Sequence, residues 1–163
     1  AILAFGRILC QFFMVVKDRF YKSKFIQDLT FKNFNAKCAE NRTLYDWLTR
    51  DKDIVDRYMR DELCGQICTA GFYHDFFGGI REVQKQQNIE KTDKNTPVFI
   101  FSGEMDPVGQ YGKVVKNVYH AYKSAGFHDI TCKLYEGGRH EMLNETNRDE
   151  VIEDIISWMI LKM

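Results

Sequence analysis

Apolar residues along the first ninety positions recur at helical spacing rather than alternating as in a strand. At the start of the chain they stand three or four positions apart: Ile2, Phe5, Leu9, Phe12 and Val16. This run is too short to cross about 30 Å of hydrocarbon, and its charges follow it, whereas those of a signal peptide precede the apolar run. We therefore expect a buried or surface-docked helix and no transmembrane span.

Two further helices are expected before residue 65. Thr43 and Asp46 have the spacing of a capping box, which predicts a helix opening at residues 41–43. A third helix should begin near Asp51 or Asp53. The aromatic-rich segment 71–77 fits either core packing or the wall of an apolar pocket, and four residues in it are substrate-pocket candidates: Phe72, Tyr73, Phe76 and Phe77.

The pattern changes after a polar connection at residues 90–96. The apolar run Val98–Phe101 is typical of a strand buried on both faces. A helix over residues 112–125, a strand over Ile130–Tyr135 and a last helix capped within residues 144–147 follow. This order predicts a parallel βαβ unit. Because parallel sheets normally hold several strands, we expect the edge of a larger sheet, with a helical cap at residues 1–92 and a core at residues 93–163.

Composition describes an ordinary globular protein and excludes few functions. Hydrophobic residues form 45% of the chain, which is enough for a packed core. The 23 basic and 23 acidic residues cancel, which argues against a nucleic-acid binder. Five cysteines, with only Cys64 and Cys68 closely spaced, fit neither a disulfide framework nor a zinc site, so we expect reduced thiols, no metal and a cytoplasmic location.

Two titratable residues follow the two expected strands at matching positions. Asp106 comes five residues after Phe101, and His140 comes five residues after Tyr135. Ligand-handling residues of open α/β sheets lie just beyond the carboxyl ends of the strands. A carboxylate placed there next to an imidazole is the orienting half of a hydrolytic triad, although an Asp-Pro turn and a loop histidine also have purely structural uses.

The residues around both positions resemble the C-terminal part of an α/β-hydrolase. The two motifs are PVFIFSGEMDPVG at residues 97–109 and KLYEGGRHEMLNE at residues 133–145. They are similar to those of the bacterial lysophospholipases, monoacylglycerol lipases and serine aminopeptidases. The resemblance implies that Asp106 is the triad acid and His140 the triad base, with no cofactor. It extends to residues 41–51 and Cys64–Gly65, which resemble the helical cap.

The nucleophile of that family is not among these residues. None of the four serines stands in Gly-x-Ser-x-Gly, the motif that carries the nucleophilic serine. Ser102 ends a strand and precedes a glycine, but in the resembled motif it is a turn residue. The first strands and the oxyanion hole of the family are missing too. We therefore expect a cap and C-terminal portion whose partner is the missing N-terminal half or a second copy of the chain.

Three functional hypotheses remain. The first is a serine hydrolase of carboxylic esters that acts on acyl esters or lipids such as monoacylglycerols and lysophospholipids. The second is a non-catalytic fragment that persists only by association, since an incomplete sheet exposes a strand edge. The third, ranked below the ester hydrolase, is an aminopeptidase, which needs an anionic group for the substrate amine; the cap offers Asp61, Glu62 and Asp75.

Overall fold

The computed structural model describes residues 2–163 and groups them into two compact units. The first unit is formed by the chain up to Asn33 together with Gly65–Lys91, and the second by Phe34–Cys64 together with Thr92–Met163. The predicted cap at residues 1–92 and core at residues 93–163 is a different division and stays a prediction. In residues 2–163 no helix combines the length and the apolarity needed to cross a membrane.

The first unit is helical, as its spacing predicts. Its helices are α1 (Ile2–Val16), α2 (Lys24–Phe31), α4 (Ala70–Val83) and α5 (Gln86–Glu90). The starts of α2 and α4 are fixed by hydroxyl caps. Ser23 accepts a hydrogen bond from the backbone N–H of Ile26 at 3.3 Å, and Thr69 accepts one from that of Phe72 at 3.1 Å.

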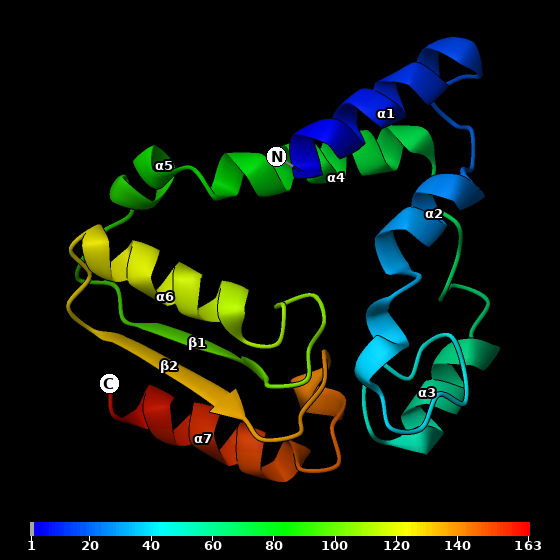
Figure 1. Cartoon of the computed structure of the whole chain (residues 1–163). Coiled ribbons are helices and arrows are strands. Elements are labelled where there is room, and N and C mark those ends of the chain that lie inside the picture. The colour runs from blue at the N-terminus through cyan, green and yellow to red at the C-terminus, as the bar shows by residue number, and fades with distance from the viewer. Residues whose placement is uncertain (1) are drawn as a thin grey trace. The chain divides into compact units, whose positions relative to one another are not determined.

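Helix α1 lies side by side with α4 in Figure 1, and Gly6 permits the close approach. A Cβ on Gly6 would lie 2.9 Å from the ring of Phe77. The buried cluster of this unit consists of Cys10, Ile26, Ala70, Tyr73 and Phe77. The helix at the start of the chain is thus confirmed, but most of the recurring stripe that predicted it is exposed: Ile2, Phe5, Phe12 and Val16.

The second unit contains a two-stranded parallel sheet with flanking helices. Strand β1 (Val98–Gly103) pairs with β2 (Ile130–Tyr135), with Val98 opposite Ile130 and Gly103 opposite Tyr135. Helices α6 (Lys113–Ser124) and α7 (Arg148–Ile160) lie on opposite faces of the sheet (Figure 1). This confirms the predicted fold class. The remaining elements are η1 (Phe34–Lys37), α3 (Lys52–Arg60) and η2 (Met142–Asn144).

Strand β1 is less buried than its apolar sequence predicts. Its first four residues are half-buried, and only Ser102 and Gly103 are buried. Within residues 2–163 the sheet has two strands, so β1 has one strand neighbour. The expectation of a strand buried on both faces is therefore wrong for residues 2–163. Helices lie on both faces of the sheet, but the second edge of β1 has no strand neighbour among these residues, and parallel strands are normally buried within larger sheets.

The helix expected from Thr43 is also wrong, since residues 44–47 form turns. The side-chain contact that suggested it is present: Asp46 accepts hydrogen bonds from the backbone N–H and the hydroxyl of Thr43, at 2.6 and 2.9 Å. The backbone carbonyls of Trp47 and Leu48 instead accept hydrogen bonds from the loop after β2. Tertiary hydrogen bonds therefore replace those of a helix. The next expected helix, α3, is confirmed and is capped by Asp51.

Helix α7 packs one side of its apolar surface on the sheet. Val151 is fully buried with Tyr135 and Met142, and Phe101 and Ile155 pack against them. Asn147 holds the cap position, as expected for the range 144–147, but its side chain makes no cap hydrogen bond. The expected apolar face is only partly covered, since four of its residues are exposed to 40% or more: Ile152, Ile156, Met159 and Ile160.

Candidate active site

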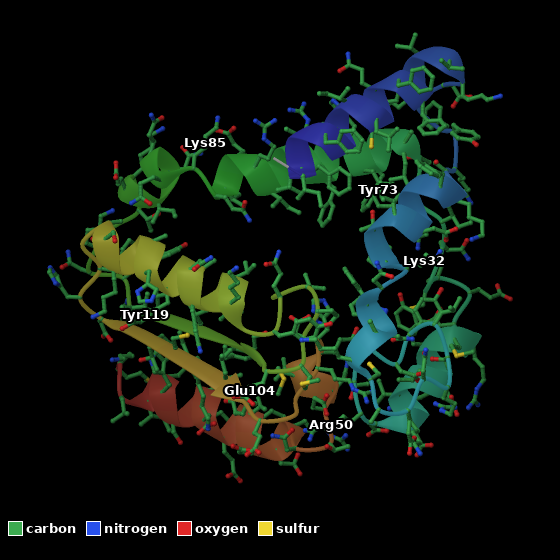
Figure 2. The ribbon with its side chains drawn as sticks, viewed as in Figure 1. Lys32, Arg50, Tyr73, Lys85, Glu104 and Tyr119 are labelled. Carbon is green, nitrogen blue, oxygen red and sulfur yellow. The ribbon has the colours of Figure 1, made fainter. Side chains whose placement is uncertain are left out.

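The loops that leave β1 and β2 are held together by backbone contacts. Glu104, labelled in Figure 2, donates its backbone N–H to the carbonyl of Tyr135 at 3.0 Å, and Met105 donates to Gly138 at 2.8 Å. A Cβ on Gly103 would lie 2.1 Å from the carbonyl oxygen of Gly138, so only glycine fits there. These contacts bring the two loops with the candidate residues together at the carboxyl ends of the strands.

Asp106 and His140, which are 34 residues apart in the chain, meet in this structure. The Nδ1 atom of His140 lies 3.2 Å from both carboxylate oxygens of Asp106. The Asp106 side chain is 8% exposed and that of His140 is 37% exposed. Because an ionised carboxylate only accepts hydrogen bonds, Nδ1 carries the proton and Nε2 is the basic nitrogen. This is the orientation that the acid and base of a hydrolytic triad require, so the geometry fits the predicted pair.

Asp106 is held by further donors. The backbone N–H of Val108 donates to its Oδ1 at 2.8 Å, and the hydroxyl of Ser102 donates to its Oδ2 at 3.3 Å. Burial acts to raise the pKa of Asp106, but the hydrogen bond and charge of His140, with the backbone N–H groups of Val108 and Gly109, hold that pKa below its ordinary value. The carboxylate therefore stays charged beside the imidazole. Ser102 lies where it supports this carboxylate.

The pair opens into a pocket of about 450 Å³ formed by the second unit. Its lining combines apolar and polar side chains: Phe101, Ser102, Asp106, His140, Glu141, Met142, Leu143 and Asn144. A concave site with a few convergent polar groups is the usual form of a small-molecule site. Glu141 also supports the loop, because its backbone N–H donates to Leu48 and its carboxylate accepts from the side chain of Asn144, at 2.7 and 2.8 Å.

Trp47 is a neighbour of His140 that the sequence reasoning missed. The two rings have centroids 5.2 Å apart at an interplanar angle of 44°. Trp47 falls within the helix that the Thr43–Asp46 spacing predicts, and nothing in its spacing relates it to a histidine 93 positions later. Its ring is 8% exposed and also contacts Phe34 edge-on. The segment around it therefore belongs to the surroundings of the candidate base.

The four aromatic pocket candidates lie on α4 in the first unit. Tyr73, labelled in Figure 2, and Phe77 are buried at 2% and 9% exposure, whereas Phe72 and Phe76 are about half exposed. The buried pair supports the core-packing interpretation for those two residues, with the Tyr73 hydroxyl donating to Gln27. Whether any of the four lines a substrate pocket stays a prediction.

The other histidines and the cysteines have no such arrangement. His120 and His128 are exposed, as expected, and His74 contacts Arg7 and Asp75 in the first unit. All five cysteines are free. Cys10 is buried and the other four are half-buried, whereas reduced thiols in a cytoplasmic protein are expected to be mostly buried. Among residues 2–163 no group of three or more His, Cys, Asp or Glu side chains is placed to hold a metal ion.

Residues 9–147 match the family described as serine aminopeptidase, S33. The chain belongs to this family. The match spans both motifs that carry Asp106 and His140, and the expected relation to the α/β-hydrolases is thereby confirmed. A search of the curated proteins gave no match.

Several solved structures share the fold of this chain. A thermostable carboxyl esterase from Bacillus coagulans is 24% identical, with a TM-score of 0.86 over 96% of this chain and 51% of the esterase. A lipase in its open form is 22% identical, with a TM-score of 0.77 over 91% of this chain and 48% of the lipase. The monoacylglycerol lipase of Paleococcus ferrophilus is 15% identical, with a TM-score of 0.60. This match covers 97% of this chain and 65% of the lipase. The chain thus spans about half the length of the first two.

Proposed function

We propose that this chain supplies the acid and base of a serine hydrolase that cleaves carboxylic esters with an acyl chain, such as monoacylglycerols or lysophospholipids. The observation that carries the proposal is the Asp106–His140 contact of 3.2 Å at the mouth of a pocket. Family membership and the esterase and lipase structures of the same fold support it.

In the proposed reaction, Nε2 of His140 takes the proton of a serine hydroxyl as the serine oxygen attacks the ester carbonyl carbon. The imidazolium then protonates the leaving alcohol, and an acyl-enzyme remains. Water, activated by the same nitrogen, releases the acid and restores the serine. Asp106 keeps the imidazole in the required tautomer and stabilises its charged form. No cofactor takes part in these steps.

The serine of this proposal comes from outside the 163 residues. None of Ser23, Ser102, Ser124 and Ser157 stands in Gly-x-Ser-x-Gly, and the hydroxyl of Ser102 is bonded to Asp106. Strand β1 has β2 as its neighbour within residues 2–163, and its other edge is where a further strand would pair. We propose that the N-terminal half of such a hydrolase pairs there and carries the serine. A second copy of the chain has the same four serines, so its pairing at this edge belongs to the non-catalytic association hypothesis. A cytoplasmic location is part of the proposal and is supported by the five free cysteines.

The test uses the native protein with p-nitrophenyl esters of increasing chain length. We expect His140→Ala to lower kcat by at least about 10³-fold, because loss of a triad member removes proton transfer. His128→Ala is the matched control, since His128 is exposed on a loop away from the Asp106 carboxylate. Full activity in His140→Ala would refute the assignment of the base.

An aminopeptidase is the second candidate, and two observations favour it. The family description names this activity, and the carboxylate of Glu141 lines the pocket beside His140, where it offers a partner for a substrate amine. Amino-acid p-nitroanilides assayed beside the esters separate the two activities. Hydrolysis of the anilides alone would replace the ester proposal, and Glu141→Gln would then raise KM.

The third possibility, a non-catalytic fragment held by association, has its own readout. Size-exclusion chromatography with light scattering measures the mass of the chain in solution, and intact mass spectrometry measures the length of the native polypeptide. A stable monomer of 19.2 kDa would count against the association hypothesis. A native polypeptide with no Gly-x-Ser-x-Gly motif and no partner would count against the hydrolase.

A further inference from the structure

Glu145 is a fully buried carboxylate with a complete set of hydrogen bonds. Its Oε1 accepts from the backbone N–H groups of Arg139 and Arg50, at 2.8 and 3.2 Å. Its Oε2 accepts from Nε of Arg50 at 2.8 Å and from the backbone N–H of Thr146 at 3.0 Å. Burying a carboxylate is costly unless it is paired and hydrogen-bonded. Glu145 therefore has little freedom to move relative to either chain segment.

The two segments that Glu145 joins are the loop with His140 and residues 46–50. Apart from Asn147, which bonds the Arg50 side chain, four further residues of the loop contact residues 46–50. The backbone N–H of His140 donates to the carbonyl of Trp47 at 3.3 Å, and that of Glu141 donates to Leu48 at 2.7 Å. The remaining two contacts involve side chains: Thr49 Oγ1 with the carbonyl of Asn144, and Arg139 Nη1 with the carbonyls of Asp46 and Thr49.

The Arg50 side chain makes two of the contacts between residues 46–50 and the loop. Its guanidinium, in a residue labelled in Figure 2, donates Nε to Glu145 and Nη2 to the side chain of Asn147 at 2.8 Å. Asn147 is the cap residue of α7, so the Arg50 side chain connects residues 46–50 to the C-terminal end of the loop segment 139–147. Glu145 extends the connection to the other end of the segment through the backbone N–H of Arg139. A planar guanidinium can do this with fixed geometry, whereas an ammonium cannot.

His140 lies between these contacts and the catalytic carboxylate. Asp106 contacts Nδ1, and the Trp47 ring lies 5.2 Å from the imidazole ring. The backbone N–H of His140 is hydrogen-bonded to the carbonyl of Trp47, and Glu145 follows five positions later in the same loop. The orientation of the imidazole therefore depends on residues 46–50 as well as on Asp106.

We propose that Arg50 and Glu145 are positioning residues for His140: the ion pair fixes residues 46–50 against the loop, and this keeps Nδ1 on Asp106 and Nε2 toward the pocket. The functional meaning of this inference rests on the proposed function. Catalysis is sensitive to such positioning, because a displacement of about 1 Å costs on the order of 100-fold in rate.

The first test is independent of any enzymatic activity. The Nδ1 proton of His140 is observed by NMR in the 163-residue chain and is assigned by its loss in Asp106→Asn. Arg50→Lys keeps the positive charge, but a lysine cannot donate to Glu145 and to Asn147 at the same time with the fixed geometry of a guanidinium. We expect this variant to shift the Nδ1 proton resonance and to speed its exchange with water by at least about 10-fold, because the hydrogen bond to Asp106 opens more often.

Arg42→Lys is the matched control. Arg42 donates Nη1 to Asp56 at 2.7 Å and Nη2 to the carbonyl of Lys52 at 3.3 Å, so it is a similar forked arginine in the same unit without a contact to the His140 loop. We expect the Nδ1 proton of His140 to keep its resonance and exchange rate in this variant. An equal change in Arg42→Lys and Arg50→Lys would overturn the proposal, since any loosening of the unit would then have the same effect.

Glu145→Gln is the second variant, and it removes the charge while keeping the shape. Unchanged Nδ1 resonances in both Arg50→Lys and Glu145→Gln would overturn the proposal. Unfolding of both, monitored by circular dichroism, would also overturn it, because the pair would then be a requirement of the fold. If Glu145→Gln unfolds and Arg50→Lys does not, the Nδ1 resonance and exchange rate of His140 in Arg50→Lys decide whether the proposal holds.

A second arm measures ester hydrolysis in the native protein. We expect Arg50→Lys to lower kcat by about 100-fold with KM changed less than twofold, because positioning acts on proton transfer rather than on substrate binding. If the unmodified protein hydrolyses no ester, the proposed function fails, whereas the NMR arm still decides the positioning role. An unchanged kcat in an active protein would contradict the positioning role alone.

Discussion

The two compact units bury different kinds of side chain. The first buries an almost wholly apolar cluster between helices, formed by Cys10, Ile26, Ala70, Tyr73 and Phe77. Among the described residues the second unit also buries five polar or charged side chains, whereas the first buries one, the capping Ser23. The five are Asp46, Thr49, Ser102, Asp106 and Glu145. Apolar burial is non-directional and stabilises a fold, whereas buried polar groups must be hydrogen-bonded and therefore fix geometry. The comparison shows that the polar interior belongs to the unit that holds the candidate acid and base.

The first prediction tests whether apolar packing dominates the stability of the first unit. Ile26 is 1% exposed in its cluster, so we expect Ile26→Ala to reduce the free energy of unfolding by about 3 kcal/mol through lost burial and a residual cavity. Urea unfolding measures this loss. Leu29→Ala, at a residue that is 59% exposed on the same helix, is the control. A similar loss at both positions would show that the cluster is not the main source of stability.

The second prediction tests a polar contact in the second unit. The hydroxyl of the buried Tyr135 donates to Asp154 Oδ2 at 2.8 Å, and Asp154 also pairs with Lys133. Burial, together with the nearby Asp154, raises the pKa of Tyr135. We expect Tyr135→Phe to lower the free energy of unfolding by about 1 kcal/mol, the usual net value of one hydrogen bond.

Thermal unfolding monitored by near-ultraviolet circular dichroism gives the size of the Tyr135→Phe effect. Tyr119→Phe is a control on α6 in the same unit, where the ring is only half-buried. No loss in Tyr135→Phe would indicate that ring packing, rather than the hydroxyl, holds Tyr135.

The third prediction concerns acid pH and has the smallest expected effect. The pKa of Asp106 lies below its ordinary value in the folded chain. A group whose pKa is lowered on folding stabilises the fold above its unfolded pKa, about 3.9 for Asp, and this stabilisation is lost as the pH falls through the folded pKa. The stability difference between the unmodified chain and Asp106→Asn should therefore be constant at neutral pH and shrink below about pH 4.

Urea unfolding at a series of pH values measures that difference. Asp129→Asn, which removes an exposed partner of Lys162, is a control from the same unit. A difference that grows on acidification would mean that the sign of the Asp106 shift is wrong.

Much of the fold is predictable because local patterns coincide with it. Both strands, α1, α3, α6 and α7 follow from apolar spacing and turn residues, and Asp106 and His140 follow from their positions after the strands. The helix expected at Thr43 fails because the carbonyls of Trp47 and Leu48 bond to the His140 loop, about ninety positions away. The spacing of Thr43 and Asp46 reflects only interactions between neighbouring residues, so it cannot predict hydrogen bonds to a loop that is distant in the sequence.

The sequence by itself determined which chemistry to expect, since a carboxylate and an imidazole at equivalent strand ends, within two recognisable motifs, predict an acid–base pair. Only the tertiary structure decided what surrounds that pair. Trp47, Arg50 and Glu145 reach the His140 loop through hydrogen bonds between segments distant in the chain. A buried carboxylate takes its partners from whichever backbone packs against it, and packing of that kind is a property of the folded chain rather than of any local pattern.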